Sequence, residues 1–194
     1  TCRVLKLSLC CIALTITACG NGFLYKKESN KTPDGGDSKS VRRVTAEGAT
    51  IRMLGDGFIF TEGPASAVDG SVYFCDSRGG SLHHWSPFSG IRKAPADSVY
   101  PVGTFVDQDG SLIICSSRNR NVMALRPDGS REVLADRFEG KRLNNPNDLW
   151  IDPNGGIYFT DPDWGRRPSE LGGGRVFYLA PDRKRLIPVI EDIN

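Results

Sequence analysis

Short runs of β-branched and aromatic residues, separated by turn-forming residues, fill the chain from about residue 48 to its end. They include the stretches "GSLHHWSP", "NVMALRPDGSREVLA" and "GRVFYLAPDRKRLIPVI", and turn signals recur every 8 to 12 residues. No stretch of this region shows a convincing helical period. The pattern predicts an all-β protein built from short antiparallel strands.

Three segments of this region repeat one another: "VDGSVYFCDS" (68–77), "QDGSLIICSS" (108–117) and "PNGGIYFTDP" (153–162). Their turn residues Asp69, Asp109 and Asn154 lie 40 and then 45 residues apart. A β unit of this length, with about four strands, is typical of a β-propeller blade. Residues 48–194 would then form a partial propeller of about three to three and a half blades. Because unclosed blades expose strand edges, we expect a longer gene product or pairing with another half.

Glu62, Val102 and Asn147 each lie seven residues before the turn residue of their repeat. The stretch "FTEGP" looks like a turn before a strand, and a charged residue is unexpected where the chain enters a core. Equivalent positions of propeller blades face one central channel, so we expect Glu62 and Asn147 to converge on it. The alternative is that both residues only cap turns, as polar side chains often do.

A carboxylate and an amide oxygen are hard ligands that suit a divalent cation. Ca²⁺ is the favoured ion, with Mg²⁺, Mn²⁺ or Zn²⁺ as alternatives. One Glu and one neutral Asn would leave the ion net positive, and it would need more ligands than this chain visibly supplies. His83 and His84 are the only histidines. Adjacent strand residues point to opposite faces, so we expect these two to pack or to lie at the surface.

Cys75 and Cys115 occupy equivalent repeat positions. Such positions on neighbouring blades lie too far apart for a disulfide, so we expect small packing residues. Trp85, Trp150 and Trp164 are predicted to pack within blades, with a place at the channel mouth as the alternative for Trp164.

The segments "FTEGPASAVDGSVYFCD" and "RLNNPNDLWIDPNGGIYFTDPDWG" resemble hallmark segments of the SMP-30/gluconolactonase/luciferin-regenerating family. The resemblance implies a six-bladed β-propeller with a divalent metal in its channel, and hydrolysis of sugar lactones or related esters. It implies metal binding by Glu62, and metal or substrate binding by Asn147. It assigns Asn145 and Asp148 to substrate binding, with Asp148 and Asp161 supporting the site. The family's later metal-binding Asn and its general-base Asp would fall beyond residue 194, so the base is unassigned.

The first residues differ from the rest of the chain. Arg3 and Lys6 precede the apolar run "LSLCCIALTI", which is too short to span a bilayer as a helix. The residues before Cys19 resemble the lipobox of bacterial lipoproteins. We therefore predict a lipoprotein signal peptide (1–18), lipidation of Cys19 and a flexible polar tether (19–47). An unlipidated secretory leader is the alternative.

This interpretation places the protein in the bacterial cell envelope, lipid-anchored and facing the periplasm or the surface. Removal of residues 1–18, which hold two basic residues and no acid, turns the formal charge of +2 into zero. A neutral chain gives no electrostatic case for nucleic-acid binding.

Two functions remain open on the sequence. The first is a metal-dependent hydrolase of sugar lactones or related esters. The second is a non-catalytic, membrane-tethered propeller that binds a ligand, or a truncated fragment. The same fold carries both, so architecture alone does not decide between them.

Overall fold

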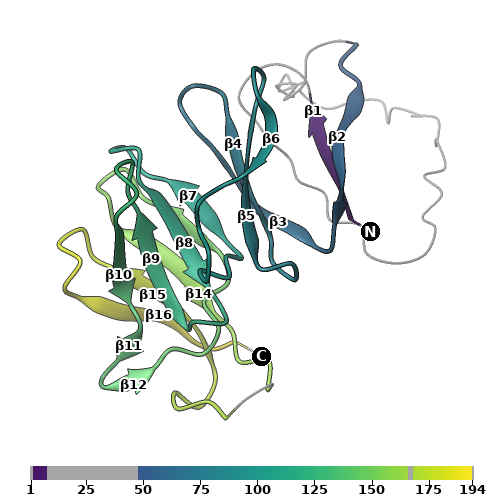
Figure 1. Cartoon of the computed structure of the whole chain (residues 1–194). Helices are drawn as coiled ribbons and strands as arrows, with labels where there is room; N and C mark the ends of the chain where they lie inside the picture. Colours follow the sequence, from purple (N-terminus) through teal and green to yellow (C-terminus); the bar gives the residue numbers. More distant parts are fainter. Residues whose placement is uncertain (1, 8–47, 166–167, 194) are drawn as a thin grey trace, which may run out of the picture.

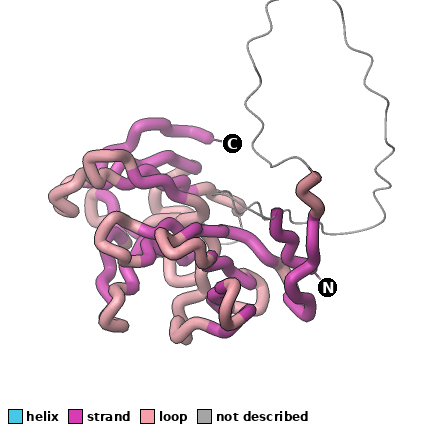
Figure 2. Tube along the Cα trace, turned by 90° about the horizontal axis from the view of Figure 1, so that it is seen from above, coloured by secondary structure: helices cyan, strands magenta, loops and turns pink. Residues whose placement is uncertain are grey.

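The computed structural model describes residues 2–7, 48–165 and 168–193. Strands and loops account for all of these residues, and they contain no helix (Figure 2). No segment among them is a helix that could span a membrane. Cys19 and the predicted tether lie outside the described residues, and so does most of the predicted leader.

Three four-stranded antiparallel sheets form the body of the molecule (Figure 1). In each sheet, neighbouring strands follow one another along the chain. The first sheet comprises β3 (Thr61–Ser66), β4 (Val72–Asp76), β5 (Ser81–Ser86) and β6 (Gly90–Lys93). The second comprises β7 (Thr104–Val106), β8 (Leu112–Ser116), β9 (Asn121–Leu125) and β10 (Arg131–Ala135). The third comprises β13 (Leu149–Ile151), β14 (Ile157–Asp161), β15 (Gly174–Leu179) and β16 (Leu186–Ile193).

Each predicted repeat is the turn and second strand of one sheet, so the predicted all-β partial propeller is confirmed. In the turns, the Asp69 and Asp109 carboxylates accept the backbone N–H groups of Ser71 and Ser111 at 2.9 and 2.8 Å. These local hydrogen bonds explain why an Asp-Gly pair marks these two turns. In the third repeat, Asp152 accepts the backbone N–H groups of Asn154 and Gly156 at the Asn-Gly turn.

The sheets pack face to face through apolar clusters. Between the first and second sheets lie Cys75 and Leu82 from one side and Ile114 from the other. Between the second and third lie Ile113 and Phe159, among others. Ile113 and Ile114 are adjacent in β8 and therefore serve opposite interfaces. Both faces of the second sheet are thus buried, and all five residues of β8 are buried.

Two two-stranded sheets accompany the three larger ones. β11 (Arg137–Phe138) pairs with β12 (Lys141–Arg142), a hairpin that the sequence pattern did not predict. β2 (Ile51–Phe58) pairs with β1 (Cys2–Leu7), which lies within the predicted leader. β2 also covers the free face of the first sheet, where the Phe58 and Phe74 rings meet edge to face with centroids 5.3 Å apart.

The first strand of the first sheet corrects one expectation. "FTEGP" is not a turn, because β3 runs through the Gly-Pro pair from Thr61 to Ser66. Its pairing with β4 shifts between Glu62 and Ala65, which marks a β-bulge. A bulge re-aims side chains on a strand. It accommodates Gly63 and Pro64 without ending the strand.

Candidate functional site

The first strands of the three sheets, β3, β7 and β13, lie beside one another. Glu62 pairs with Cys75 across the first sheet, and the Val102 amide donates to the Cys115 carbonyl at 2.9 Å. The Asn147 amide donates to the Thr160 carbonyl at the same distance. Glu62, Val102 and Asn147 therefore occupy equivalent positions, as their common spacing predicted.

Close backbone approach holds these strands together. A Cβ atom added to Gly63 would lie 1.9 Å from the Val102 carbonyl oxygen, and one added to Gly103 would lie 2.4 Å from the Asn147 carbonyl oxygen. Gly63 also has a left-handed φ of 57°. The Thr104 hydroxyl donates to the Gly63 carbonyl. The glycines that follow Glu62 and Val102 thus allow the segments that carry Glu62, Val102 and Asn147 to lie against one another.

Two cavities open between these strands, and Glu62, Val102 and Asn147 line both. The larger cavity has a volume of about 590 Å³ and also contacts Asn145. The smaller one, about 410 Å³, also contacts Asp148. The structure therefore brings the predicted residues Glu62, Asn145, Asn147 and Asp148 to one region, with Asn145 and Asp148 on different cavities.

Glu62 is the half-buried carboxylate of this region. Burial raises the pKa of Glu62 above its ordinary value, and the nearby charge of Asp148 acts in the same direction. A hydrogen bond with Ser77 and the charge of Arg78 oppose the rise. A carboxylate that is costly to ionise in the free protein gains from a cation placed beside it.

The donors present fit a hard divalent cation in kind. Glu62 and Asp148 offer carboxylate oxygens and Asn147 offers an amide oxygen, all on the smaller cavity. No group of three His, Cys, Asp or Glu side chains forms a metal cluster within the described part of the chain. These donors therefore suit part of a coordination sphere.

Asp161, predicted to support the site, anchors the loop before β13. Its carboxylate accepts the backbone N–H groups of Asn144 and Asn145 at 2.8 and 2.7 Å. The Asn145 side-chain amide donates to the Pro162 carbonyl at 3.1 Å. Asn145 is thereby fixed from both its backbone and its side chain, with 4% of the residue exposed.

Asp76 anchors the segment before β3 in the first sheet. The sequence analysis did not predict this role. Its carboxylate accepts the backbone N–H groups of Ile59 and Phe60 at 3.0 and 2.8 Å. Asp76 and Asp161 are the last residues of β4 and β14, so the repeat alignment carried the signal. We call these two residues the loop-anchoring carboxylates.

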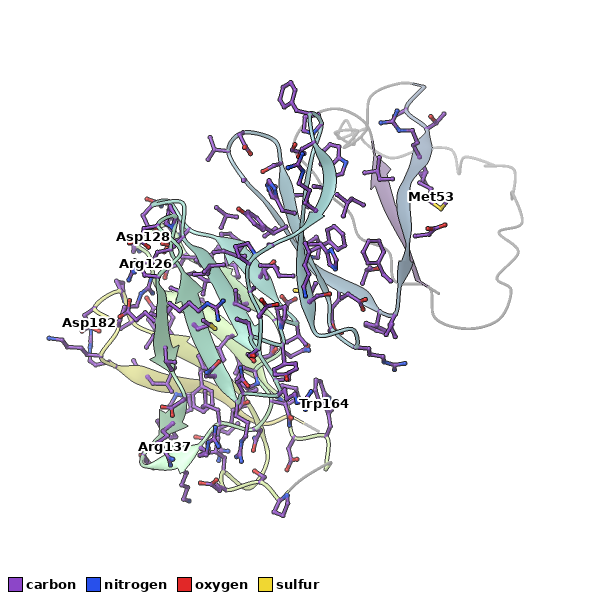
Figure 3. The ribbon with its side chains drawn as sticks, viewed as in Figure 1. Met53, Arg126, Asp128, Arg137, Trp164 and Asp182 are labelled. Atoms are coloured by element: carbon purple, nitrogen blue, oxygen red, sulfur yellow. The ribbon has the colours of Figure 1, made fainter. Side chains whose placement is uncertain are left out.

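The mouth of the larger cavity carries aromatic and basic side chains that sequence reasoning also missed. The Arg78 guanidinium carbon lies 5.0 Å from the Phe60 ring centroid, and that of Arg118 lies 4.1 Å from the Tyr100 ring centroid. Trp164 completes this lining from the loop after β14 (Figure 3). The alternative considered for Trp164, a place at the mouth, is the one the structure shows.

The remaining candidates are packing residues. His83 stacks on Phe74 with centroids 5.2 Å apart, and His84 packs on Tyr73. Burial lowers the pKa of His83 and raises the pKa of Cys75 and Cys115. Both cysteines are free and buried, as predicted.

Two of the tryptophans differ in burial. Trp85 is buried against the cluster formed with β2, as expected of blade packing. Trp150 packs on Tyr158 of its own sheet with centroids 5.9 Å apart, but 53% of it is exposed.

Comparison with known proteins agrees with this architecture. The SMP-30/Gluconolactonase/LRE-like region matches residues 60–194. The chain therefore belongs to this family. A gluconolactonase of Zymomonas mobilis is 28% identical over 192 residues, which cover 87% of this chain and 54% of that protein. A pentonolactonase of Haloferax volcanii is 32% identical over 126 residues, covering 62% of this chain and 39% of that protein.

A solved gluconolactonase structure also resembles this chain. The solved structure of a gluconolactonase from Xanthomonas campestris superposes with a TM-score of 0.66 at 30% identity, over 71% of this chain and 50% of the other. The chain spans about half the length, or less, of these relatives.

Proposed function

We propose that this chain supplies part of the active site of a metal-dependent hydrolase that acts on sugar lactones or related esters. One observation carries the proposal. Glu62 and Asn147, from equivalent positions on separate sheets, line the same two cavities. Gluconolactonase and pentonolactonase relatives support lactones as the substrate class.

In this proposal Glu62 and Asn147 hold a divalent cation, with Ca²⁺ favoured over Mg²⁺, Mn²⁺ or Zn²⁺. The bound cation would supply Lewis-acid polarisation of the lactone carbonyl. Glu62 contributes the negative charge, and Asn147 contributes a neutral oxygen that leaves net positive charge at the site. Asn145 and Asp148 orient the substrate from the two cavities.

The overall reaction adds water across the ring ester. The water oxygen bonds to the carbonyl carbon and the bond to the ring oxygen breaks. One proton passes from the water to the departing alkoxide, which leaves a hydroxy acid. A positioned carboxylate is suited to move this proton. Asp148 is an exposed carboxylate on the smaller cavity, but its place there does not assign it as the base.

We also propose that Cys19 carries the lipid that holds the protein at a bacterial membrane, with residues 19–47 as the tether. The motif before Cys19 supports this proposal. Mass spectrometry of the protein from its membrane fraction should find an acylated N-terminal Cys19. An unmodified N-terminus at another residue would contradict it.

Hydrolysis of glucono-δ-lactone with and without a chelator tests the enzymatic proposal. We expect chelation to abolish hydrolysis. Glu62→Gln should lower kcat/KM by on the order of 100-fold or more, because even mutation of a residue that only hydrogen-bonds to a metal ligand lowers metal affinity or activity by 10- to 100-fold. Glu132→Gln is the matched control, because Glu132 is exposed on β10 and pairs with Arg126. Equal rates for wild type and Glu62→Gln would contradict the proposal. Specific lactone binding without hydrolysis would favour the non-catalytic binding module.

A further inference from the structure

Two arginines stand at matching positions on the mouth of the larger cavity. Arg78 and Arg118 each lie two residues after the last residue of the second strand of their sheet. The rings beneath them, Phe60 and Tyr100, also match, since each lies two residues before a channel residue. The first two sheets therefore present the same arginine-on-aromatic pair to the cavity.

Neither guanidinium is neutralised by an ion pair with a carboxylate in the described part of the chain. Both arginines are exposed. Stacking on a ring restrains the plane of a guanidinium while its N–H edge stays open to a ligand. This arrangement presents oriented N–H donors for a carboxylate or a phosphate.

The charge of the cavity favours the same class of ligand. Among the described residues that line it, Arg78 and Arg118 are the cations and Glu62 is the only acid. The lining is therefore net positive, and a cation held by Glu62 would make it more so. A neutral lactone would leave both guanidinium groups without an anionic partner.

The backbone also holds one of these pairs in an unusual conformation. Tyr100 has a φ of 51°, which is rare for a bulky residue. Residues held in such conformations cluster at active sites and ligand clamps. The third sheet departs from the pattern, because Asn145 takes the place of the ring and Asp163 that of the arginine. Among the described residues, the cationic side chains that line this cavity thus come from the first two sheets.

We infer that the substrate is an anionic lactone, and that Arg78 and Arg118 bind a carboxylate or phosphate group that it carries in addition to the ring ester. This inference rests on the lactonase function proposed above. Arg78 and Arg118 then determine specificity by binding the charged group, while Glu62 and Asn147, which are less exposed, line the same cavity.

The test compares charged and neutral lactones on the whole chain. The substrates are glucaro-1,4-lactone, which carries a carboxylate, 6-phosphogluconolactone and neutral glucono-δ-lactone. Replacement of both arginines (Arg78→Gln with Arg118→Gln) should lower kcat/KM for at least one charged lactone by 100-fold or more, since each charged hydrogen bond lost costs about 10- to 100-fold. The neutral lactone should lose at least about 10-fold less than the charged one, because it has no anionic group to bind either arginine. Arg92→Gln, an exposed arginine on β6, is the control and should change neither.

A binding measurement separates this inference from the proposed function. Calorimetric titration with glucarate, an open-chain dianion that cannot be hydrolysed, should show binding that the double variant loses and that weakens as salt rises. Arginine-dependent glucarate binding without lactone hydrolysis would overturn the lactonase function and keep the anion site. Hydrolysis of the neutral lactone with equal losses for all three substrates, or with no glucarate binding, would overturn the anion site alone.

Discussion

Glu62, Val102 and Asn147 occupy equivalent positions on the three sheets and line the same two cavities. The residue is polar in the first and third sheets and apolar in the second. The same two sheets have a loop-anchoring carboxylate, Asp76 or Asp161, that accepts two backbone N–H groups from the segment before the first strand. Asp76 also accepts the Gly79 N–H at 3.2 Å. The second sheet has Ser116 at that position, and its hydroxyl donates to the Val99 carbonyl. A polar residue at the position of Glu62 or Asn147 and a loop-anchoring carboxylate therefore occur in the same sheets.

The comparison teaches that one backbone unit serves two purposes. In the second sheet the inner segment contributes the apolar Val102 to the cavities, and apolar clusters lie on both faces of the sheet. In the other two sheets the anchored loop leads, within a few residues, to the side chain that faces the cavity. An anchored loop limits the motion of that side chain, as a preorganised site requires.

The largest expected effect concerns the contact between sheets. Gly63→Ala should lower the free energy of unfolding by more than about 4 kcal/mol, because the new Cβ meets the Val102 carbonyl in addition to the left-handed strain. Gly70→Ala is the matched control. Gly70 has a φ of 79° with no atom near its added Cβ, so only the strain of about 1 kcal/mol remains. Denaturant unfolding measures both, and similar losses would show that the sheets do not meet as described.

The anchors give the next effect. Asp161→Ala leaves two buried backbone N–H groups without this acceptor, and Asp76→Ala leaves three partly buried ones, so each should cost about 2–5 kcal/mol in the free energy of unfolding. Ser116→Ala removes a hydroxyl that donates to the Val99 carbonyl and accepts the Asn119 backbone N–H at 3.3 Å. The Val99 carbonyl keeps a second donor, the Asn119 side-chain amide, so the change should cost about 1 kcal/mol. Urea unfolding of the three variants measures these losses in the free energy of unfolding. A loss for Ser116→Ala as large as the other two would erase the distinction between the sheets.

A pH dependence sharpens the comparison at Asp161. Burial raises the pKa of Asp161 from an ordinary 3.8 to about 6, although the Asn144 and Asn145 amides favour its charged form. The pKa of Asp161 is higher in the folded state than in the unfolded state. Its contribution to the free energy of unfolding is therefore fully present below pH 4 and is lost as the pH rises through 6. The loss is at most about 3 kcal/mol. Between pH 4 and 7, the free energy of unfolding should fall less steeply with pH for Asp161→Asn than for wild type. Parallel curves for the two proteins would contradict this assignment.

The smallest effect concerns the cysteines between sheets. Cys75→Ala and Cys115→Ala should each cost about 1 kcal/mol, since each removes one buried sulfur from a packed interface. Their raised pKa and burial should keep both thiols unreactive in the folded protein. Alkylation followed by peptide mass spectrometry should label them only on unfolding. Rapid labelling would mean that the interfaces open readily.

The sequence predicted the repeat well because local hydrogen bonds fix the Asp-Gly and Asn-Gly turns, which can therefore be recognised from neighbouring residues alone. The common offset to those turns also predicted that Glu62, Val102 and Asn147 are equivalent. The continuous β3 was missed, because Gly-Pro usually ends a strand and the bulge depends on its partner strand. Asp76 was missed because its hydrogen bonds join residues 16 and 17 positions away. The stacked arginines depend in the same way on rings brought close only by the fold.

The central claim is that Glu62 and Asn147 meet at one cavity and hold a divalent cation. Titration with Mn²⁺, followed by the NMR signals of the Asn147 side-chain amide, tests it most directly. A paramagnetic ion at the site should broaden this signal strongly at low Mn²⁺ concentration, and Glu62→Gln should restore it while Glu132→Gln should not. An Asn147 signal that stays sharp, or one that broadens equally in the Glu62→Gln variant, would contradict the account.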